Sequence, residues 1–217
     1  MTEKDPFLFH SRLSFALNSK ILHPREVIER DLKSWEANSE VIGLAQIEGF
    51  IRQILGWREY MRGIYWAKMP EYRSLNHFGY TNKLPDFFCT GKKKMRCVGQ
   101  AIRQSLDHAN AHHIQRLVVT GNFAMLAGIN PDEVDRWYLG ISIDAVEWVE
   151  LPNTRCMSQY ADEGLSASKP YAASANYLNK MGTTANIVIM ILKSVSGKKR
   201  APSTASIGLF WKIQRKN

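Results

Sequence analysis

Apolar residues recur at helical spacing along much of the chain, while the alternation typical of strands is scarce. Residues 44–57 show the pattern best, because four apolar side chains fall three or four positions apart on one face: Ile47, Phe50, Ile51 and Ile54. Residues 95–128 form the longest helical candidate and close on Gly128, whereas residues 69–94 hold two prolines and two glycines and predict a loop. These patterns predict an all-α fold.

Two further helices carry start signals. Residues 23–37 place Pro24 at a first helical position and Glu26 in the first turn. Residues 129–140 place Asn130 as a cap before Pro131, with Glu133 where a capping-box acid belongs. No apolar run approaches the length that spans a bilayer, and the stretch "ANIVIMIL" at 185–192 is eight residues long. We therefore expect no membrane partner.

Charge narrows the class of partner. The chain has 29 Lys and Arg against 20 Asp and Glu, a net charge of +9. This excess favours an anionic partner, nucleic acid before a membrane surface, although a basic surface kept for solubility explains it equally well. The three cysteines form no CxxC pair and no secretion signal is visible, which indicates a cytoplasmic protein.

Three histidines and an arginine lie between residues 105 and 126. On a helix His112 and His113 would share a face with Arg116, four and three positions away. A histidine at neutral pH can donate a proton, so catalysis in a cavity is one interpretation. Buried, satisfied histidines are the alternative, and metal binding is less favoured because no acidic or cysteine partner sits at ligand spacing.

Three other stretches carry candidate chemistry. Residues 53–66 interleave aromatic and arginine side chains, which suits a flat cofactor or an unstacked base as well as it suits an amphipathic core helix. Residues 137–153 set Asp144, Glu147 and Glu150 among apolar residues, so one acid is expected to be buried and paired. Hydroxyls at Ser11 and Ser14 could hold a phosphate at a helix start.

Together these stretches resemble the flavin-binding domain of the photolyase/cryptochrome family, closest to its bacterial iron–sulfur branch that includes (6-4) photolyases. The resemblance runs from about residue 6 to residue 181, through "FLFHSRLS", "EGFIRQILGWREYMRGIYW", "HANAHHIQRL", "TGNFAMLAGINP", "RWYL", "EWVELPN" and "KPYAASANYLNKM". It implies an all-α domain that holds FAD and, in light, passes an electron to a pyrimidine dimer flipped out of UV-damaged DNA.

The resemblance also implies residue roles. It assigns FAD binding to His10, Ser11, Arg12, Leu13, Ser14, Gln53, Arg58, Arg116, Asp144 and Glu150. Within that set Arg116 pairs with Asp144 beside the flavin ring, and Glu150 faces flavin N5. His113 matches the histidine that protonates a (6-4) photoproduct, and Tyr171 matches a tyrosine that contacts the lesion. Trp137 and Tyr138 match part of an electron relay to the flavin.

The chain departs from the family pattern in three ways. It begins inside the pattern, so we expect no N-terminal α/β antenna domain. Position 89, where the branch has a relay tryptophan, is Cys89. Cys97 matches the first ligand of the [4Fe-4S] cluster, but no other ligand follows, so we expect this chain not to assemble the cluster.

Residues 182–217 contain no acidic residue and break the helical pattern, so a strand pair or a poorly ordered tail is expected there. A third hypothesis is a shifted reading frame from about Thr183, because codon degeneracy then permits a C-x2-C pair and a later third cysteine. The predicted organisation is a partial FAD-binding domain at 1–181 and an atypical tail at 182–217.

The sequence thus predicts a monomeric, light-dependent DNA-repair enzyme, most consistent with repair of (6-4) photoproducts. Two alternatives stay open: a non-catalytic, cryptochrome-like flavoprotein photoreceptor, and a helical nucleic-acid-binding protein without flavin. A bound yellow chromophore would distinguish either flavoprotein from the flavin-free protein. Repair under blue light would distinguish the enzyme from the photoreceptor.

Overall fold

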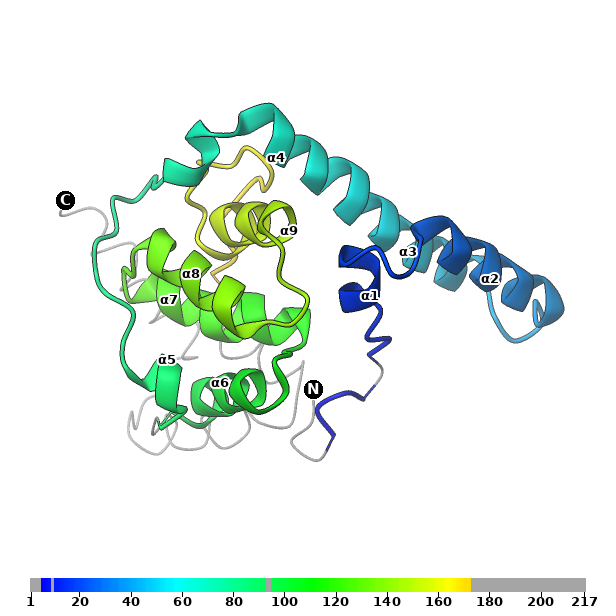
Figure 1. Ribbon diagram of the computed structural model, residues 1–217, viewed down its shortest axis with the longest axis horizontal. Helices are drawn as coiled ribbons and strands as arrows, with labels where there is room; N and C mark the ends of the chain where they lie inside the picture. The colour runs from blue at the N-terminus through cyan, green and yellow to red at the C-terminus, as the bar shows by residue number, and fades with distance from the viewer. Residues whose placement is uncertain (1–4, 9, 93–94, 173–217) are drawn as a thin grey trace, which may run out of the picture.

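A computed structural model describes residues 5–8, 10–92 and 95–172 (Figure 1). All secondary-structure elements assigned within these ranges are helices. In those ranges the only β-type pairing is one isolated bridge between Asn82 and Ile129. The prediction of an all-α fold is therefore confirmed. The boundary expected at residue 181 and the tail at 182–217 lie outside the described residues.

The helical segments follow one another with short connections. In chain order they are α1 (Ser14–Asn18), α2 (Pro24–Ala37), α3 (Leu44–Leu55), the π-helical η1 (Gly56–Met61), α4 (Arg62–Lys68), the 3₁₀ turn η2 (Glu71–Ser74), α5 (Phe87–Thr90), α6 (Arg96–His108), the π-helical η3 (Gln115–Gly121), α7 (Asn122–Leu126), α8 (Pro131–Ile141), α9 (Glu147–Pro152) and the π-helical η4 (Asn153–Ser158). No described helix is both long and apolar enough to cross a bilayer.

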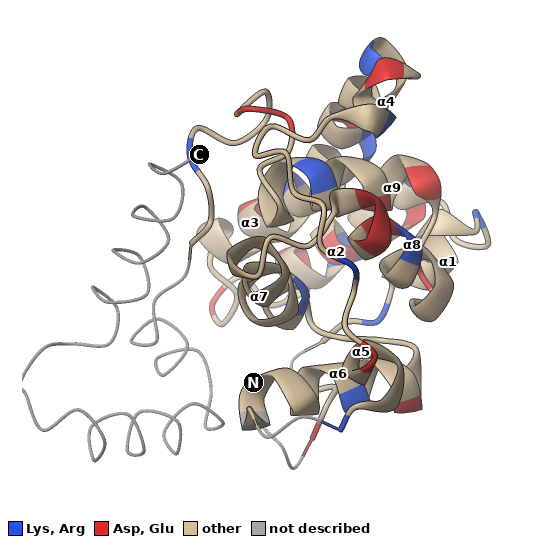
Figure 2. Cartoon of the chain, turned by 90° about the vertical axis from the view of Figure 1, so that its left-hand side faces the viewer, with Lys and Arg blue, Asp and Glu red and all other residues tan. Residues whose placement is uncertain are grey.

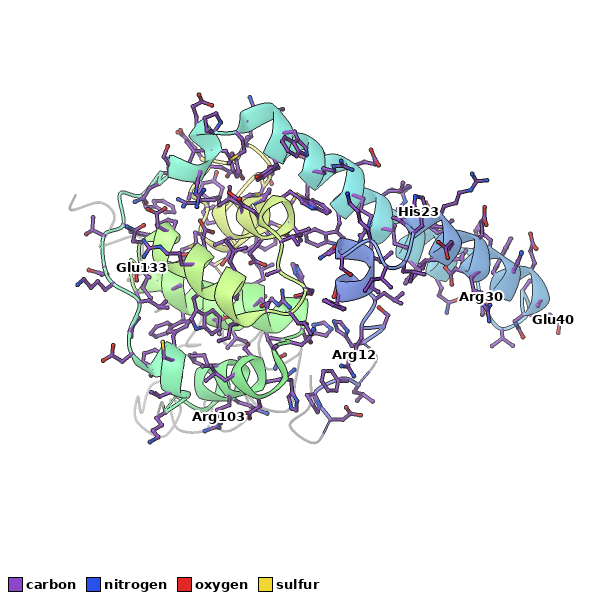
Figure 3. The ribbon with its side chains drawn as sticks, in the orientation of Figure 1. Arg12, His23, Arg30, Glu40, Arg103 and Glu133 are labelled. Carbon is purple, nitrogen blue, oxygen red and sulfur yellow. The ribbon has the colours of Figure 1, made fainter. Side chains whose placement is uncertain are left out.

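Helices α2 and α3 form a hairpin that projects from the body of the molecule (Figure 1). The start of α2 is as predicted: the His23 ring accepts from Arg25 N at 3.2 Å, and Glu26 accepts from His23 N at 3.3 Å. No residue of α2 is buried, and His23, Arg30 and Glu40 lie along this arm in Figure 3. The arm continues through α3, η1 and α4 as one long helical rod.

The hydrophobic core lies in the body, between α5, α6, η3, α7 and α8. Its buried members are Phe88, Val98, Ala101, Ile102, Val119, Ala124, Ile129, Val134, Trp137 and Tyr138. Phe88 and Trp137 meet edge to face, with ring centroids 5.2 Å apart, and the Trp137 indole donates to Phe88 O at 3.0 Å. This core fixes α8, and with it the residues that follow toward the site.

Two expected local structures are wrong. The single helix expected over 95–128 is broken, because α6 ends at His108 and Ala109 adopts a left-handed backbone (φ 50°) that no right-handed helix continues. The capping box expected at 130–133 is also absent. Asn130 does cap α8, accepting from Asp132 N at 2.9 Å, but Glu133 pairs with Arg136 at 3.2 Å instead. Over the described residues 69–92 the expected loop is confirmed, apart from the short segments η2 and α5.

Candidate functional site

A cavity of about 280 Å³ lies between the N-terminal segment, the α3–η1 rod, η3 and the α9–η4 segment. This volume is close to the lower end of the range for small-molecule sites, roughly 300–1,000 Å³. Each wall comes from a different part of the chain, so residues from 10 to 158 meet around one space.

All three π-helical segments of the described chain contribute to this cavity. η1 supplies Trp57 and Arg58, η3 supplies Arg116, and η4 supplies Asn153 and further residues of its turn. π-Helical turns are rare and often occur at functional sites, because the extra residue per turn redirects side chains from the regular helical face. Their convergence on one cavity supports a binding role for it.

An ion pair between η3 and the loop after α8 forms one side of the cavity. Arg116 Nη2 donates to Asp144 Oδ1 at 2.8 Å, and Arg116 Nε donates to Ala111 O at 3.0 Å. Glu150 lies further away, with 3.8 Å between its Oε2 and Arg116 Nη1. The arginine and the aspartate paired on the family resemblance are therefore in contact.

The two acids around Arg116 differ in their proton affinity. Burial alone would raise the pKa of Asp144, but Arg116 and a hydrogen bond from Ser14 hold that pKa below its usual value. Burial raises the pKa of Glu150, and the more distant Arg116 offsets this only in part. The Arg116 guanidinium thus favours the carboxylate form of Asp144, whereas burial makes Glu150 easier to protonate than a carboxyl group in water.

The N-terminal segment brings four of its five expected residues to the cavity: His10, Ser11, Leu13 and Ser14. Arg12 does not line it. Its backbone is left-handed (φ 56°) and its guanidinium carbon lies 4.1 Å from the centre of the Phe7 ring, on the segment that leads into α1 (Figure 3). The left-handed turn reverses the direction of this one side chain, which spacing alone could not predict.

His113 lines the cavity and meets Trp57 edge to face, with ring centroids 5.5 Å apart. The residue as a whole is exposed to solvent. Desolvation of its ring at the cavity wall, with a smaller contribution from Arg116, lowers the pKa of His113 to about 4. His112 does not line the cavity, and its Nδ1 accepts from Ile114 N at 3.2 Å.

The expected relay residues connect the cavity to the core. Tyr138 lines the cavity wall, and its ring centroid lies 5.0 Å from that of Trp137. The Tyr138 hydroxyl lies 2.6 Å from Thr120 Oγ1 and donates to Arg116 O at 2.9 Å. Trp137 contacts Phe88, the residue before the exposed Cys89. A continuous aromatic path therefore leads from the cavity toward Cys89.

The remaining expected residues are placed as follows. Gln53 lines the cavity beside Arg58. Tyr171 is 45% exposed and is not among the cavity residues. Cys97 lines a separate, mostly apolar cavity between α6 and η3–α7, and burial raises the pKa of its thiol. Among the described residues, no group of three or more His, Cys, Asp or Glu side chains gathers, so Cys97 has no companion ligand there.

Asn18 and Gly121 are among the residues of the site that sequence reasoning missed. Asn18, the last residue of α1, bonds both Arg58 and the backbone of Asp144. Gly121 allows η3 to approach η4, because a Cβ there would overlap the Ser158 side chain and lie 2.8 Å from Arg116 O. A lone asparagine and a lone glycine in a helical pattern carry no signal that would have identified either.

The donor set fits FAD, a long anionic ligand with a diphosphate. Within the described chain, Arg58 makes no ion pair, and its hydrogen bond goes to the neutral amide of Asn18 at 3.1 Å. Within the described chain, the cavity therefore holds one guanidinium that no carboxylate neutralises, and the Ser11 side chain also lines it. The charges of Arg116 and Asp144 offset one another. An un-neutralised guanidinium suits a diphosphate, and the aromatic and apolar walls suit a ring.

Comparison with known proteins gives the family. No family model matches the chain. A (6-4) photolyase of Agrobacterium fabrum is 45% identical over 217 residues, which is all of this chain and 42% of that protein. Two uncharacterized proteins of Acanthamoeba polyphaga mimivirus match in part. One is 33% identical over 104 residues, which are 48% of this chain and 78% of the viral protein. The other is 40% identical over 60 residues, which are 28% of this chain and 49% of the viral protein.

The match to the Agrobacterium protein covers every wall of the cavity, and this chain spans less than half the length of that relative. With this identity along its whole length and a helical fold, the chain belongs to the photolyase family.

Proposed function

We propose that this chain binds FAD in the cavity and takes part in light-dependent repair of UV-damaged DNA, with the (6-4) photoproduct as the substrate. The observation that carries the proposal is the cavity itself, whose walls combine an un-neutralised Arg58 with the buried Arg116–Asp144 pair. The choice of lesion follows the Agrobacterium relative, which is a (6-4) photolyase.

In this proposal the chain's residues divide between the two ends of FAD. His10, Ser11, Leu13, Ser14 and Arg58 hold the diphosphate side. Gln53, Arg116, Asp144 and Glu150 hold the ring side, where Asp144 keeps Arg116 in place. When bound, reduced FAD supplies the electron that light delivers to the lesion. Tyr138 and Trp137 pass electrons inward from the surface.

His113 is the proposed acid for the lesion, and its low pKa sets a condition on that role. Alone in the cavity the ring is neutral at pH 7 and donates one N–H. The negative charges of a diphosphate and of DNA would stabilise the imidazolium and raise the pKa of His113. The proton is thus best supplied after both ligands have bound. Tyr171, which is exposed and lies outside the cavity lining, is proposed to contact the lesion.

A non-catalytic flavoprotein is the second candidate, and Cys89 is the observation that favours it. An exposed thiol stands at the surface end of the aromatic path, where the resemblance expects a tryptophan. A slower electron supply would leave the flavin oxidised for longer in light. Restoring tryptophan with Cys89→Trp should speed photoreduction of bound flavin if this relay operates.

The test is repair by the reconstituted chain. The chain is loaded with FAD, photoreduced, and incubated under blue light with an oligonucleotide that contains one (6-4) photoproduct. The expected result is loss of the lesion with the native chain and none with His113→Ala, while both retain FAD. Bound FAD without repair would favour the photoreceptor alternative, and no bound FAD would favour the flavin-free alternative.

A further inference from the structure

Arg58 is the one cavity cation whose charge is left available within the described chain. Arg116 is engaged by Asp144 and Glu150, whereas Arg58 Nη2 donates to Asn18 Oδ1 at 3.1 Å and meets no carboxylate within ion-pair distance. Partial burial lowers the pKa of Arg58, but an arginine stays charged at any physiological pH. A half-buried guanidinium with only a neutral partner favours an anion beside it.

The Asn18 amide is held in one orientation by a second bond. Its Nδ2 donates to the backbone oxygen of Asp144 at 2.7 Å, which leaves Oδ1 to face Arg58. The asparagine therefore links three segments: α1, η1 and the loop that carries Asp144. An aspartate at this position would place an oxygen against the Asp144 carbonyl and would neutralise Arg58 with the other.

We propose that Asn18 is a positioning residue that fixes the Arg58 guanidinium in the cavity wall without neutralising it, so that its charge is reserved for a diphosphate ligand. That the diphosphate belongs to FAD rests on the proposed function, whereas the anion site itself does not. A carboxylate at position 18 would neutralise the charge of Arg58, and an alanine would remove the hydrogen bond that holds the guanidinium in place. The asparagine amide keeps both the charge and the hydrogen bond.

Inorganic pyrophosphate is the probe, because it carries the diphosphate without a ring. Its affinity is measured by isothermal titration at near-physiological salt for the native chain and for Asn18→Asp, Asn18→Ala and Arg58→Gln. Asn38→Asp is the matched control, since Asn38 caps the exposed end of α2 and the substitution changes the net charge equally. Unfolding by urea is followed for each variant.

We expect Asn18→Asp and Arg58→Gln to lose about ten- to a hundredfold in affinity, the range for one hydrogen bond to a charged group. Asn18→Ala keeps the charge and should lose less. A purely structural asparagine gives the opposite order, because alanine loses both hydrogen bonds and aspartate keeps one. Equal affinities for the native chain and Asn18→Asp, or equal losses in Asn38→Asp, would overturn the inference. If Asn18→Asp does not fold, unchanged affinity in Arg58→Gln overturns it.

Riboflavin separates this inference from the proposed function. It has the flavin ring and no phosphate, so Asn18→Asp should bind it as the native chain does. A native chain that binds pyrophosphate but neither riboflavin nor FAD refutes the flavin proposal and leaves the anion site standing. If the native chain and Asn18→Asp bind FAD with the same affinity, the result refutes the role of Asn18 at the anion site and leaves the flavin proposal standing.

Discussion

Asp144→Asn removes the charge that holds Arg116 and keeps the size of the side chain. The pair is largely buried, with 17% of the Arg116 side chain and 12% of the Asp144 side chain exposed, and its N–O distance is 2.8 Å. Breaking a buried pair by removing one partner costs about 3–5 kcal/mol. Arg116 keeps its bond to Ala111 O and the attraction of Glu150. We therefore expect a loss of about 3 kcal/mol, the lower end of that range.

The loss is measured as the free energy of unfolding in urea and as the melting temperature. For a chain of this size, about 2–4 °C per kcal/mol gives a fall in melting temperature of about 6–12 °C. Glu48→Gln is the control, because it breaks an ion pair of 2.7 Å to Arg52 whose side chains are 52% and 74% exposed. Such an exposed pair should contribute only about 0.3–0.5 kcal/mol.

The pH dependence has a defined sign. Because the pKa of Asp144 is lower in the folded chain than in the unfolded chain, its stabilisation is fully present above the unfolded pKa and is lost as the pH falls through the folded one. The difference between the native chain and Asp144→Asn should therefore shrink in acid. Equal costs for Asp144→Asn and Glu48→Gln at pH 7 would refute the reasoning that burial decides the strength of this pair.

Further predictions concern the close approach of η3 to η4, the cavity histidine and a buried arginine. Gly121→Ala should lower the free energy of unfolding in urea by about 1–3 kcal/mol, because the Ser158 side chain must move. Gly49→Ala has open space around it and should not lower the free energy of unfolding. A larger loss in Gly49→Ala than in Gly121→Ala would contradict the close packing of η3 against η4. NMR titration of His113 should give a pKa of about 4 that rises when FAD binds. A pKa near 6.5 in the free chain would contradict desolvation of the His113 ring by the cavity wall. Arg155→Met should cost about 3–5 kcal/mol, because it leaves Asp135 buried without its partner at 2.7 Å; a loss under about 1 kcal/mol in urea unfolding would exclude a charged Asp135.

Local signals in the sequence predicted local structure well. Pro24 and Asn130 begin helices as expected, because a fixed proline φ and a side-chain cap act within one turn. The pairing of Arg116 with Asp144 came from the family resemblance, since the two are 28 positions apart and no periodicity relates them. The π-helical turns at η1, η3 and η4 and the break at Ala109 had no sequence signal, because tertiary packing selects them over the regular helix.

The net charge of the whole chain does not describe the charge of its helical domain. Seven of the 29 Lys and Arg and none of the 20 Asp and Glu fall in residues 182–217, so residues 1–181 carry 22 basic and 20 acidic side chains. Acidic and basic residues are interspersed over the described helices in Figure 2. An affinity of the helical domain for DNA must therefore come from the local arrangement of its charges around the cavity, and the total of +9 reports mainly on the tail.

The central claim is that the cavity is a flavin site, and the most direct measurement is a titration of the chain with FAD followed by visible absorption and equilibrium dialysis. The account predicts saturation at one FAD per chain and an affinity at least about tenfold lower for Arg58→Gln. Absence of saturable binding, or identical binding by the native chain and Arg58→Gln, would contradict it.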